Sequence, residues 1–333
     1  MKCWIKGVLL ICLTMLVTGS AGYYVVNDRY IRPGKVKIFR LLEPNLNYTA
    51  QQQDVHILQF YDAEGRSSRV IMIDTGMEAQ ARERLVSYLR DNQFLNIDEI
   101  FITHPHKDHY GGLYALIDSG ISIGKVWMNL PDKLVCDREI PWGCDYSDLL
   151  NVIKTVKSRN VPVEELHHAN VNQHRVLYQD RYSTLTLLFA GKSDVPGLGS
   201  VDINDLSLIM DLQVNGTRYL FTGDLNRPLS RYLARTEQGL KVDVLKVPHH
   251  GTEGTAHNEF FDKVAARVAI VPSPRDLWCS ERSARIRNYF TDHGTEIYVS
   301  GFNGDMVFNH YANGKLKIRA EHGGYEICVS ATQ

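Results

Sequence analysis

The sequence has almost no net charge, and it contains no internal repeat and no low-complexity linker. Lysine and arginine number 37 against 38 aspartates and glutamates, so the formal net charge is −1. This balance supplies no global electrostatic attraction to nucleic acid or to an anionic membrane, although a local basic groove is compatible with it. Apolar residues make up 44% and charged residues 23%, which is ordinary for a globular protein with a hydrophobic core.

The N-terminus lacks an apolar run long enough for an ordinary transmembrane helix. Lys2 and Lys6 form a short basic region, residues 7–17 are almost continuously apolar, and small residues follow. A spanning helix needs about 20 apolar residues, so this arrangement predicts a secretory signal peptide over residues 1–22. An uncleaved membrane anchor running on to Val26 is the alternative. Both interpretations place the remainder of the chain outside the cytoplasm, either exported or tethered to a membrane by this segment.

None of the six cysteines has the spacing of a zinc finger. Cys3 and Cys12 belong to the leader, which leaves an even set in the rest of the chain. That set is Cys136, Cys144, Cys279 and Cys328. In an oxidising compartment an even number favours disulfides over the alternative of free thiols. Closeness in the sequence favours a Cys136–Cys144 bond, and nothing in the sequence brings the other two cysteines together.

Hydrophobic periodicity predicts strands and helices in both halves of the chain. We expect strands over residues 35–41, 55–61, 69–73, 97–103, 125–128, 184–189, 206–212, 218–222, 242–247, 268–271, 296–299, 306–310 and 315–319. We expect helices over residues 77–91, 147–159 (capped by Ser147), 259–266 and 283–290, and another after Gly112. Hairpins mixed with strand–helix units predict an α/β fold with two mixed sheets back to back and helices outside. We expect one catalytic domain over residues 30–325.

Four potential metal ligands lie within six residues, directly after an apolar strand: His104, His106, Asp108 and His109. Residues two apart in an extended loop point the same way, so His104 and His106 can hold one ion together. Asp108 and His109 can then reach a second ion. Imidazole with carboxylate suits zinc, and iron or manganese where carboxylates dominate. The spacing and the position at a strand end disfavour the alternative, a solvated polar loop.

Four short motifs resemble those of the metallo-β-lactamase superfamily and follow the same order. The His-x-His-x-Asp-His pattern followed by Gly-Gly resembles the second motif of that family. The first, fourth and last motifs are matched by Asp74-Thr75-Gly76, Thr222-Gly223-Asp224 and Pro248-His249-His250-Gly251. The resemblance implies a four-layer αββα sandwich, and it covers residues 70–251.

The resemblance also implies a role for each matched residue. Asp74 would orient the metal-binding loop, Asp224 would bridge two divalent ions, and His250 would bind the second ion. His249 would face the substrate as a phosphate contact or a proton donor; the reverse assignment of the two histidines is the alternative. The implied catalytic residues are Asp74, Asp108 and His249. The implied metal ligands are His104, His106, Asp108, His109, Asp224 and His250.

Within the superfamily, the chain is similar to the ComEC-type hydrolase domain of DNA-uptake proteins and to phosphorylcholine esterases. The similarity lies in residues 243–252 and in Asn204-Asp205-Leu206-Ser207. In these relatives the middle histidine of true β-lactamases, the third ligand of the first metal, is absent, and no histidine lies between His174 and Asp224. Asn204, Asp205 and Ser207 would then close the first metal's coordination or contact the substrate; the alternative is that no residue closes it. We interpret His167, His168 and His174 as surface or structural residues.

Some residues depart from the ComEC-type pattern. The Gly-Gln-Gly-Asp segment of those relatives appears only as Gln52-Gln53-Asp54, and the serine after the paired histidines is Thr252, which keeps the hydroxyl. Lys107, in the middle of the second motif, is expected to point to solvent. These departures leave the metal ligands intact and affect the identification of the substrate.

The resemblance implies an exported two-metal hydrolase, with phosphodiesters as the first choice of substrate. Two ions about 3.5–4 Å apart can hold a bridging water and lower its pKa from about 15.7 to about 7. The substrate would be a small or polymeric phosphodiester, and a lactam is less expected because the middle histidine is missing. An exported DNA nuclease is the second hypothesis, although no basic, aromatic-lined stripe is clear in the sequence. A non-catalytic binding protein is the third, but no core ligand is lost.

Overall fold

The computed structural model describes residues 24–26, 29–31, 36–139, 143–167, 174–191, 202–323 and 328. The predicted signal peptide and His168 lie outside these residues, and the domain limits 30–325 stay a prediction. Among the helices of the described residues, none combines the length and the apolar character needed to span a bilayer.

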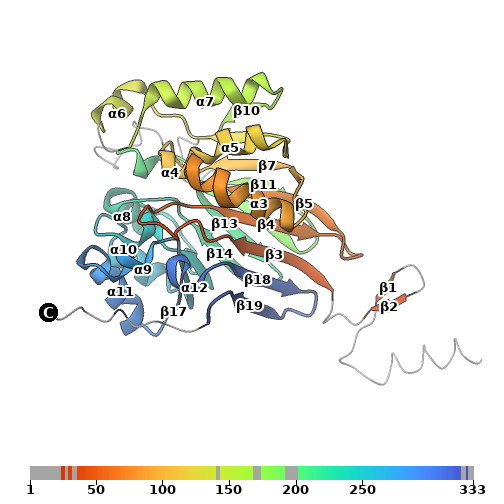
Figure 1. Cartoon of the computed structure of the whole chain (residues 1–333). Coiled ribbons are helices and arrows are strands. Elements are labelled where there is room, and N and C mark those ends of the chain that lie inside the picture. Colours follow the sequence, from red (N-terminus) through yellow and green to blue (C-terminus); the bar gives the residue numbers. More distant parts are fainter. Residues whose placement is uncertain are drawn as a thin grey trace, which may run out of the picture.

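Two mixed β-sheets form the centre of the molecule (Figure 1). In spatial order the first sheet contains β10 (Val163–Glu165), β9 (Val126–Met128), β7 (Glu99–Ile102), β5 (Ser67–Ile73), β4 (His56–Tyr61), β3 (Lys37–Glu43), β18 (Met306–Tyr311) and β19 (Leu316–Ala320). The strands from β10 to β5 run parallel, and those from β5 to β19 run antiparallel. The hairpin β18–β19 near the end of the chain therefore joins the sheet that β3, β4 and β5 begin.

The second sheet comes entirely from the second half of the chain. In spatial order it contains β11 (Arg175–Gln179), β12 (Ser183–Phe189), β13 (Ile209–Val214), β14 (Thr217–Phe221), β15 (Val244–Lys246), β16 (Val268–Val271) and β17 (Glu296–Val299). Its strands are antiparallel as far as β14 and parallel from β14 to β17. Two short pairs lie outside the large sheets: β1 (Tyr24–Val26) with β2 (Arg29–Ile31), and β6 (Asn96–Ile97) with β8 (Ser122–Ile123).

Helices cover the outer face of each sheet, and three hydrophobic clusters separate the layers. The first sheet packs against the π-helical turn η2 (Ala81–Leu85), α3 (Val86–Asp91), α5 (Gly112–Ser119) and α7 (Tyr146–Ser158), and the short α2 (Glu78–Gln80) contacts α5. The second packs against α8 (Arg227–Thr236), α9 (Asn258–Val264) and α11 (Glu281–Asp292). A third cluster fills the space between the two sheets. The predicted four-layer αββα architecture is confirmed.

Strand alternation explains why the first sheet is buried on both faces. Successive side chains of a strand point to opposite faces. Leu42, Ile57 and Met72 accordingly pack under the helices, whereas the neighbouring Leu41 and Leu58 face the other sheet. Every residue of β4 is buried, as expected for a strand between two hydrophobic layers.

Some of the predicted segments differ from the structure in position or in kind. The helix expected to be capped by Ser147 begins at Tyr146, because the carboxylate of Asp145 accepts the backbone N–H of Asp148 at 3.0 Å. The strand expected over 206–212 begins at Ile209, and residues 204–206 form a 3₁₀ turn, η3 (Asn204–Leu206). The segment 130–146, for which no helix or strand was predicted, contains α6 (Lys133–Arg138).

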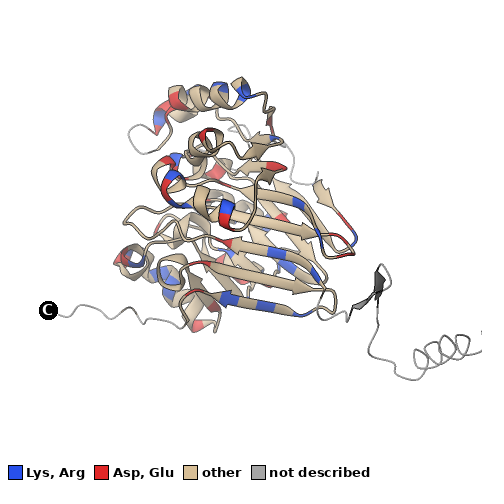
Figure 2. Ribbon diagram, turned by 45° about the vertical axis from the view of Figure 1, so that its right-hand side comes forward, with Lys and Arg blue, Asp and Glu red and all other residues tan. Residues whose placement is uncertain are grey.

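Both possible disulfides are present. Cys136 bonds Cys144, as closeness in the sequence predicts, and Cys279 bonds Cys328 across a separation of 49 residues. The second bond ties the end of the short helix α10 (Arg275–Cys279) to the C-terminal segment, a contact that only the tertiary structure creates. Acidic and basic side chains are interspersed along the helices (Figure 2).

Candidate metal centre

The four sequence motifs converge because each one follows the carboxyl end of a strand. Asp74 comes directly after β5, and His104 follows β7, its parallel neighbour in the first sheet. Asp224 follows β14, and His250 follows β15, its parallel neighbour in the second sheet. Parallel neighbours end at the same edge of a sheet, where α/β proteins commonly place their ligand sites. Stacking the sheets brings the two edges together.

The first and second motifs are joined by close backbone contacts. The N–H of Thr75 donates to the carbonyl of His109 at 2.7 Å, and the N–H of Gly112 donates to the carbonyl of Gly76 at 2.7 Å. A Cβ atom at position 112 would lie 2.0 Å from the carbonyl oxygen of Thr75. Only glycine permits this approach, which explains why a glycine follows the histidine-rich segment.

Four of the predicted ligands form one compact cluster: Asp108, His109, Asp224 and His250. Their ligand atoms all lie within 4.8 Å of one another. His250 Nε2 lies 3.0 Å from Asp224 Oδ2 and 3.4 Å from Asp108 Oδ2, and His109 Nε2 lies 3.3 Å from Asp224 Oδ2. His250 Nε2 is fully buried without a hydrogen-bond partner among the described residues. A buried nitrogen of this kind fits a metal ligand.

The other two predicted ligands face each other beside this cluster. His104 Nε2 and His106 Nδ1 are 3.1 Å apart. The second nitrogen of each ring is occupied, since His104 Nδ1 lies 3.2 Å from Thr103 Oγ1 and His106 Nε2 lies 3.0 Å from a carboxylate oxygen of Glu139. The facing nitrogens are therefore the ones free to bind a cation. The ring centroids of His104 and His109 are 4.0 Å apart, so the pair adjoins the cluster.

Asp74 contacts the second nitrogen of His109, one of the predicted ligands. Its Oδ2 lies 2.8 Å from His109 Nδ1 and accepts the Thr103 hydroxyl at 2.8 Å, while its Oδ1 accepts the Thr103 N–H at 2.7 Å. These bonds turn His109 Nε2 toward Asp224. His250 is oriented in the same manner, with Nδ1 2.8 Å from the carbonyl oxygen of Pro272. Partners of this kind fix the tautomer of a metal-binding histidine.

The charge distribution also fits a bound cation. Burial opposes a charge on His109, yet the carboxylates of Asp224 and Asp74 raise its pKa well above the ordinary histidine value. Burial also opposes a charge on His250, and the carboxylates of Asp224 and Asp54 raise the pKa of His250 in spite of it. The carboxylates around the two buried imidazoles thus favour positive charge in this site. The donor set of imidazole and carboxylate suits zinc, and also manganese or iron.

Two residues to which the sequence analysis assigned no role complete the interior of the site. Asp54 and Lys246 are fully buried and paired with each other. Lys246 Nζ also donates to Asp224 Oδ1 at 3.1 Å and to the carbonyl of Gly223 at 2.7 Å. Burial opposes the charge on Lys246, but Asp54 and Asp224 raise its pKa. The lysine therefore holds one oxygen of Asp224 and leaves the other facing the histidines.

These two residues were visible in the sequence only as parts of larger motifs. Asp54 ends the incomplete Gln52-Gln53-Asp54 segment, and Lys246 precedes the paired histidines. Their pairing joins positions 192 residues apart, which no local pattern reveals. A weak signal was present, since a lysine within an apolar strand needs a buried partner.

The residues proposed to close the first metal's coordination make other contacts. Asp205 Oδ1 accepts the N–H of Asn226 at 2.9 Å, and burial together with Asp202 raises the pKa of Asp205 to about 8. Among the described residues, no hydrogen bond or ion pair joins Asn204 or Asp205 to the facing histidines. Ser207 instead orients the fourth motif, because its Oγ accepts the N–H of Asp224 at 2.9 Å.

The paired histidines differ in surroundings. Both have left-handed backbone conformations, with φ of 47° at His249 and 52° at His250, so consecutive side chains diverge. His250 enters the cluster and is fully buried, whereas His249 stays partly exposed. His249 Nδ1 lies 2.7 Å from Asn226 Oδ1, and Asn226 Nδ2 donates to Asp202 at 2.8 Å. Burial lowers the pKa of His249.

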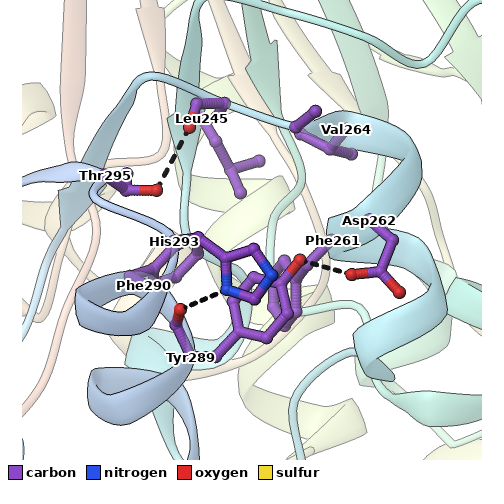
Figure 3. Close-up of a pocket in the computed structure, with 10 residues that line it drawn as sticks. Leu245, Phe261, Asp262, Val264, Tyr289, Phe290, His293 and Thr295 are labelled. Carbon is purple, nitrogen blue, oxygen red and sulfur yellow. Dashed lines mark hydrogen bonds between the residues drawn. The ribbon is translucent and has the colours of Figure 1, made fainter.

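The remaining polar residues singled out in the sequence lie away from the cluster. Lys107 Nζ forms ion pairs with Asp145 and Asp148 at 3.6 and 3.7 Å, beside the start of α7. His167 and His174 pair with Glu165 and Glu237 on the surface. A separate cavity of about 250 Å³ lies between α9 and the end of α11, lined by Phe261, Tyr289 and His293 (Figure 3). None of the predicted site residues lines this cavity.

Comparisons with known proteins agree with this geometry. The family model described as the metallo-beta-lactamase superfamily matches residues 60–122, which contain Asp74 and the histidine-rich loop. ComE operon protein 3 of Bacillus subtilis is 22% identical over 228 residues, covering 68% of this chain and 26% of that protein. Endoribonuclease YSH1 of Kluyveromyces lactis is 26% identical over 212 residues, covering 61% of this chain and 25% of that protein.

The chain spans about a quarter of the length of the curated relatives it matches. Among solved structures, unliganded yeast PDE1 aligns with a TM-score of 0.44 and 14% identity, over 79% of this chain and 97% of that one. The family model and the ordered motifs at the ends of paired strands agree with each other. By these findings, the chain has the metallo-β-lactamase fold, and its residues 60–122 are similar to the metallo-β-lactamase superfamily.

Proposed function

We propose that this chain is an exported, metal-dependent phosphodiesterase that binds two divalent ions. The observation that carries the proposal is the convergence of Asp108, His109, Asp224 and His250 beside the facing pair His104 and His106. Asp108, His109, Asp224 and His250 would hold one ion. His104 and His106 would hold the other ion, and Asp224 would contact both ions.

The chain's own residues supply what hydrolysis of a phosphodiester requires. When bound, the divalent ions make hydroxide available near neutral pH and stabilise charge that grows on the phosphoryl oxygens. One bond forms between the attacking oxygen and phosphorus while the bond to the leaving oxygen breaks, and the leaving oxygen takes up a proton. His249, at the partly exposed rim, is the proton donor. Asp74, Lys246 and Ser207 hold the ligand side chains in place through the contacts described above.

The hydrogen bonds of His249 define the form that can donate. Asn226 Nδ2 donates to Asp202, so Asn226 Oδ1 faces His249 and accepts a hydrogen bond from Nδ1–H. His249 Nε2 therefore carries a proton only when the ring is an imidazolium. Burial lowers the pKa of His249, which makes the imidazolium a stronger acid and a less populated one.

A nuclease is the second candidate, and one surface feature favours it. Helix α8 begins directly after Asn226 and presents Arg227, Arg231 and Arg235 on successive turns, all exposed. Residues four apart share one face of a helix, so a basic stripe leads away from the site. Such a stripe fits a polymeric phosphodiester, in agreement with the endoribonuclease names of two relatives. RNA or DNA cleavage that is fast at low salt and falls steeply as salt rises would support this candidate.

We expect the purified mature protein to contain close to two divalent ions, measured by elemental analysis. A chelator should abolish hydrolysis of a nitrophenyl phosphodiester, and adding back a divalent metal should restore the hydrolysis. His104→Ala and His106→Ala should each empty mainly one site, since these residues adjoin the four-residue cluster without belonging to it. A panel of phosphocholine esters, DNA, RNA and a lactam then identifies the substrate class. Metal-free protein with undiminished hydrolysis would contradict the proposal.

Export is tested by the mass of the mature chain. We expect the N-terminus of the exported protein to lie near Gly22 or Tyr23, because small residues precede this point and a short apolar run precedes them. The two disulfides support an oxidising compartment. Intact mass measurement of protein from the periplasm or the medium gives the cleavage site. A full-length species found only in membranes would indicate an uncleaved anchor.

A further inference from the structure

We propose that Glu139 is a positioning residue of the first metal site, which orients His106 so that its Nδ1 faces the ion. The proposal rests on the two-metal function proposed above. No sequence motif includes Glu139, which follows α6 in a segment where no helix or strand was predicted. The argument depends on which nitrogen of His106 each neighbour contacts.

The two nitrogens of His106 have different partners. Nδ1 lies 3.1 Å from His104 Nε2, and Nε2 lies 3.0 Å from Glu139 Oε2. A carboxylate only accepts hydrogen bonds, so Glu139 favours the tautomer with the proton on Nε2. The lone pair on Nδ1 then points toward His104, where the first ion would lie. A carboxylate behind a ligand imidazole also makes the imidazole a stronger ligand.

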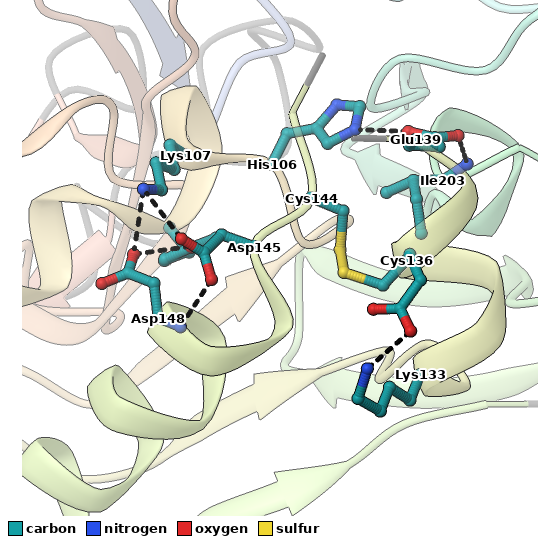
Figure 4. Close-up of a disulfide and its surroundings, with 11 residues drawn as sticks. His106, Lys107, Lys133, Cys136, Glu139, Cys144, Asp145, Asp148 and Ile203 are labelled. Atoms are coloured by element: carbon teal, nitrogen blue, oxygen red, sulfur yellow. Dashed lines mark hydrogen bonds and ion pairs between the residues drawn. A yellow bond between two sulfur atoms is a disulfide. The ribbon is translucent and has the colours of Figure 1, made fainter. Parts of the chain in front are cut away.

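Glu139 is itself held on two sides. Its Oε1 accepts the backbone N–H of Ile203, at the start of the turn that leads to Asn204 and Ser207. The helix that ends just before it, α6, is tied to Cys144 through Cys136 (Figure 4). The disulfide, the helix and the Ile203 contact thus fix the carboxylate behind His106.

The other end of the disulfide segment packs on the same ring. A Cβ atom at Gly143 would lie 2.9 Å from both Nε2 and Cδ2 of His106. Any larger residue at position 143 would have to displace the imidazole. The side chains of Glu139 and His106 are only 16% and 14% exposed, so water competes weakly for their hydrogen bond. The surroundings of the disulfide therefore determine the orientation of His106 from two directions.

The other three ligand histidines show that this arrangement is general in the site. His104, His109 and His250 each have a partner on the nitrogen opposite the ligand nitrogen, supplied by Thr103, Asp74 and Pro272. Glu139 supplies the fourth such partner. His104 is held by the hydroxyl of Thr103, and His106 is held by the carboxylate of Glu139. Its removal should therefore affect the first ion and spare the second.

The test measures metal affinity rather than activity. In wild-type protein and in Glu139→Ala and Glu139→Gln variants, zinc binding is titrated against a chromophoric chelator. We expect Glu139→Ala to lower the zinc affinity of the first site by about 10–100-fold, the usual effect of removing such a partner. The zinc affinity of the other site should be unchanged. Glu139→Gln keeps an acceptor without the charge, so an intermediate loss is expected. Asp137→Asn, which changes an exposed carboxylate on the same helix, is the matched control and should bind both ions normally.

A second readout reports the tautomer directly. In metal-free protein, ¹⁵N NMR of the histidine rings should show the Nε2–H tautomer of His106 in wild type and a mixture of tautomers in Glu139→Ala. Wild-type affinity for both ions in Glu139→Ala and Glu139→Gln, or an unchanged tautomer, would overturn the proposal. A wild-type protein that binds no metal would refute the proposed function instead, and the NMR comparison would still decide whether Glu139 orients His106. If the alanine variant fails to fold, the glutamine variant, which preserves the side-chain volume, gives both readouts.

Discussion

Replacing each of the paired histidines with alanine should separate metal binding from proton transfer. His250→Ala is expected to lose the ion of the four-residue cluster and nearly all activity, because its Nε2 lies 3.0 Å from Asp224 Oδ2 and belongs to the buried cluster. His249→Ala is expected to keep both ions and the fold, yet to turn over about 10²–10⁴-fold more slowly, the usual effect of a lost acid–base group. Elemental analysis and kcat on one phosphodiester measure the two effects.

The choice of leaving group and pH sharpens this experiment. A nitrophenyl leaving group hardly needs a proton, so His249→Ala should slow its release much less than that of an alkoxide. For the alkoxide, wild-type kcat should fall as pH rises through the pKa of His249, since only the imidazolium donates and burial lowers that pKa. The slope should be absent in His249→Ala. Loss of metal from His249→Ala with retention in His250→Ala would reverse the two assignments, and full metal with full activity in both would contradict the family motif itself.

Asp224→Ala should remove both ions together and should also destabilise the fold. Oδ2 of Asp224 faces His109 and His250, and Oδ1 accepts a hydrogen bond from the buried Lys246. Removing the carboxylate leaves Lys246 with Asp54 as its one remaining anionic partner among the described residues. Breaking a buried ion pair by removing one partner costs about 3–5 kcal/mol, and the remaining pair with Asp54 should keep the loss in free energy of unfolding at or below that range.

A partly buried ion pair between β13 and β14 provides the control. Asp211 on β13 is buried and accepts hydrogen bonds from Arg218 at 2.9 and 3.1 Å. Asp211→Ala should lower the free energy of unfolding in a urea titration while leaving the metal content near two. Asp224→Ala should lower both quantities. A folded Asp224→Ala protein that retains two ions would contradict the bridging role.

Much of the site was visible in the sequence because its chemistry is local. Three histidines and an aspartate within six residues after a strand predict metal binding without any knowledge of the fold. Strand and helix periodicity likewise predicted two mixed sheets covered by helices, since apolar alternation follows directly from which faces are buried. Local capping was less predictable, as the Asp145 cap of α7 shows, because Ser147 and Asp145 are both good N-cap residues and only the backbone geometry chooses between them.

The ligand types, their order along the chain and the strand ends that present them were all predictable from the sequence. Which nitrogen of each histidine faces the site depends on the folded arrangement, because the partner on the opposite nitrogen comes from a distant segment. Glu139 lies 33 residues from His106, and Asp74 lies 35 residues from His109. The same holds for Lys246, whose charge is tolerated in the interior only because stacking the two sheets places Asp54 and Asp224 beside it. Local patterns record which residues are adjacent in the chain, whereas buried charge and ring orientation depend on neighbours that only the packed sheets bring together.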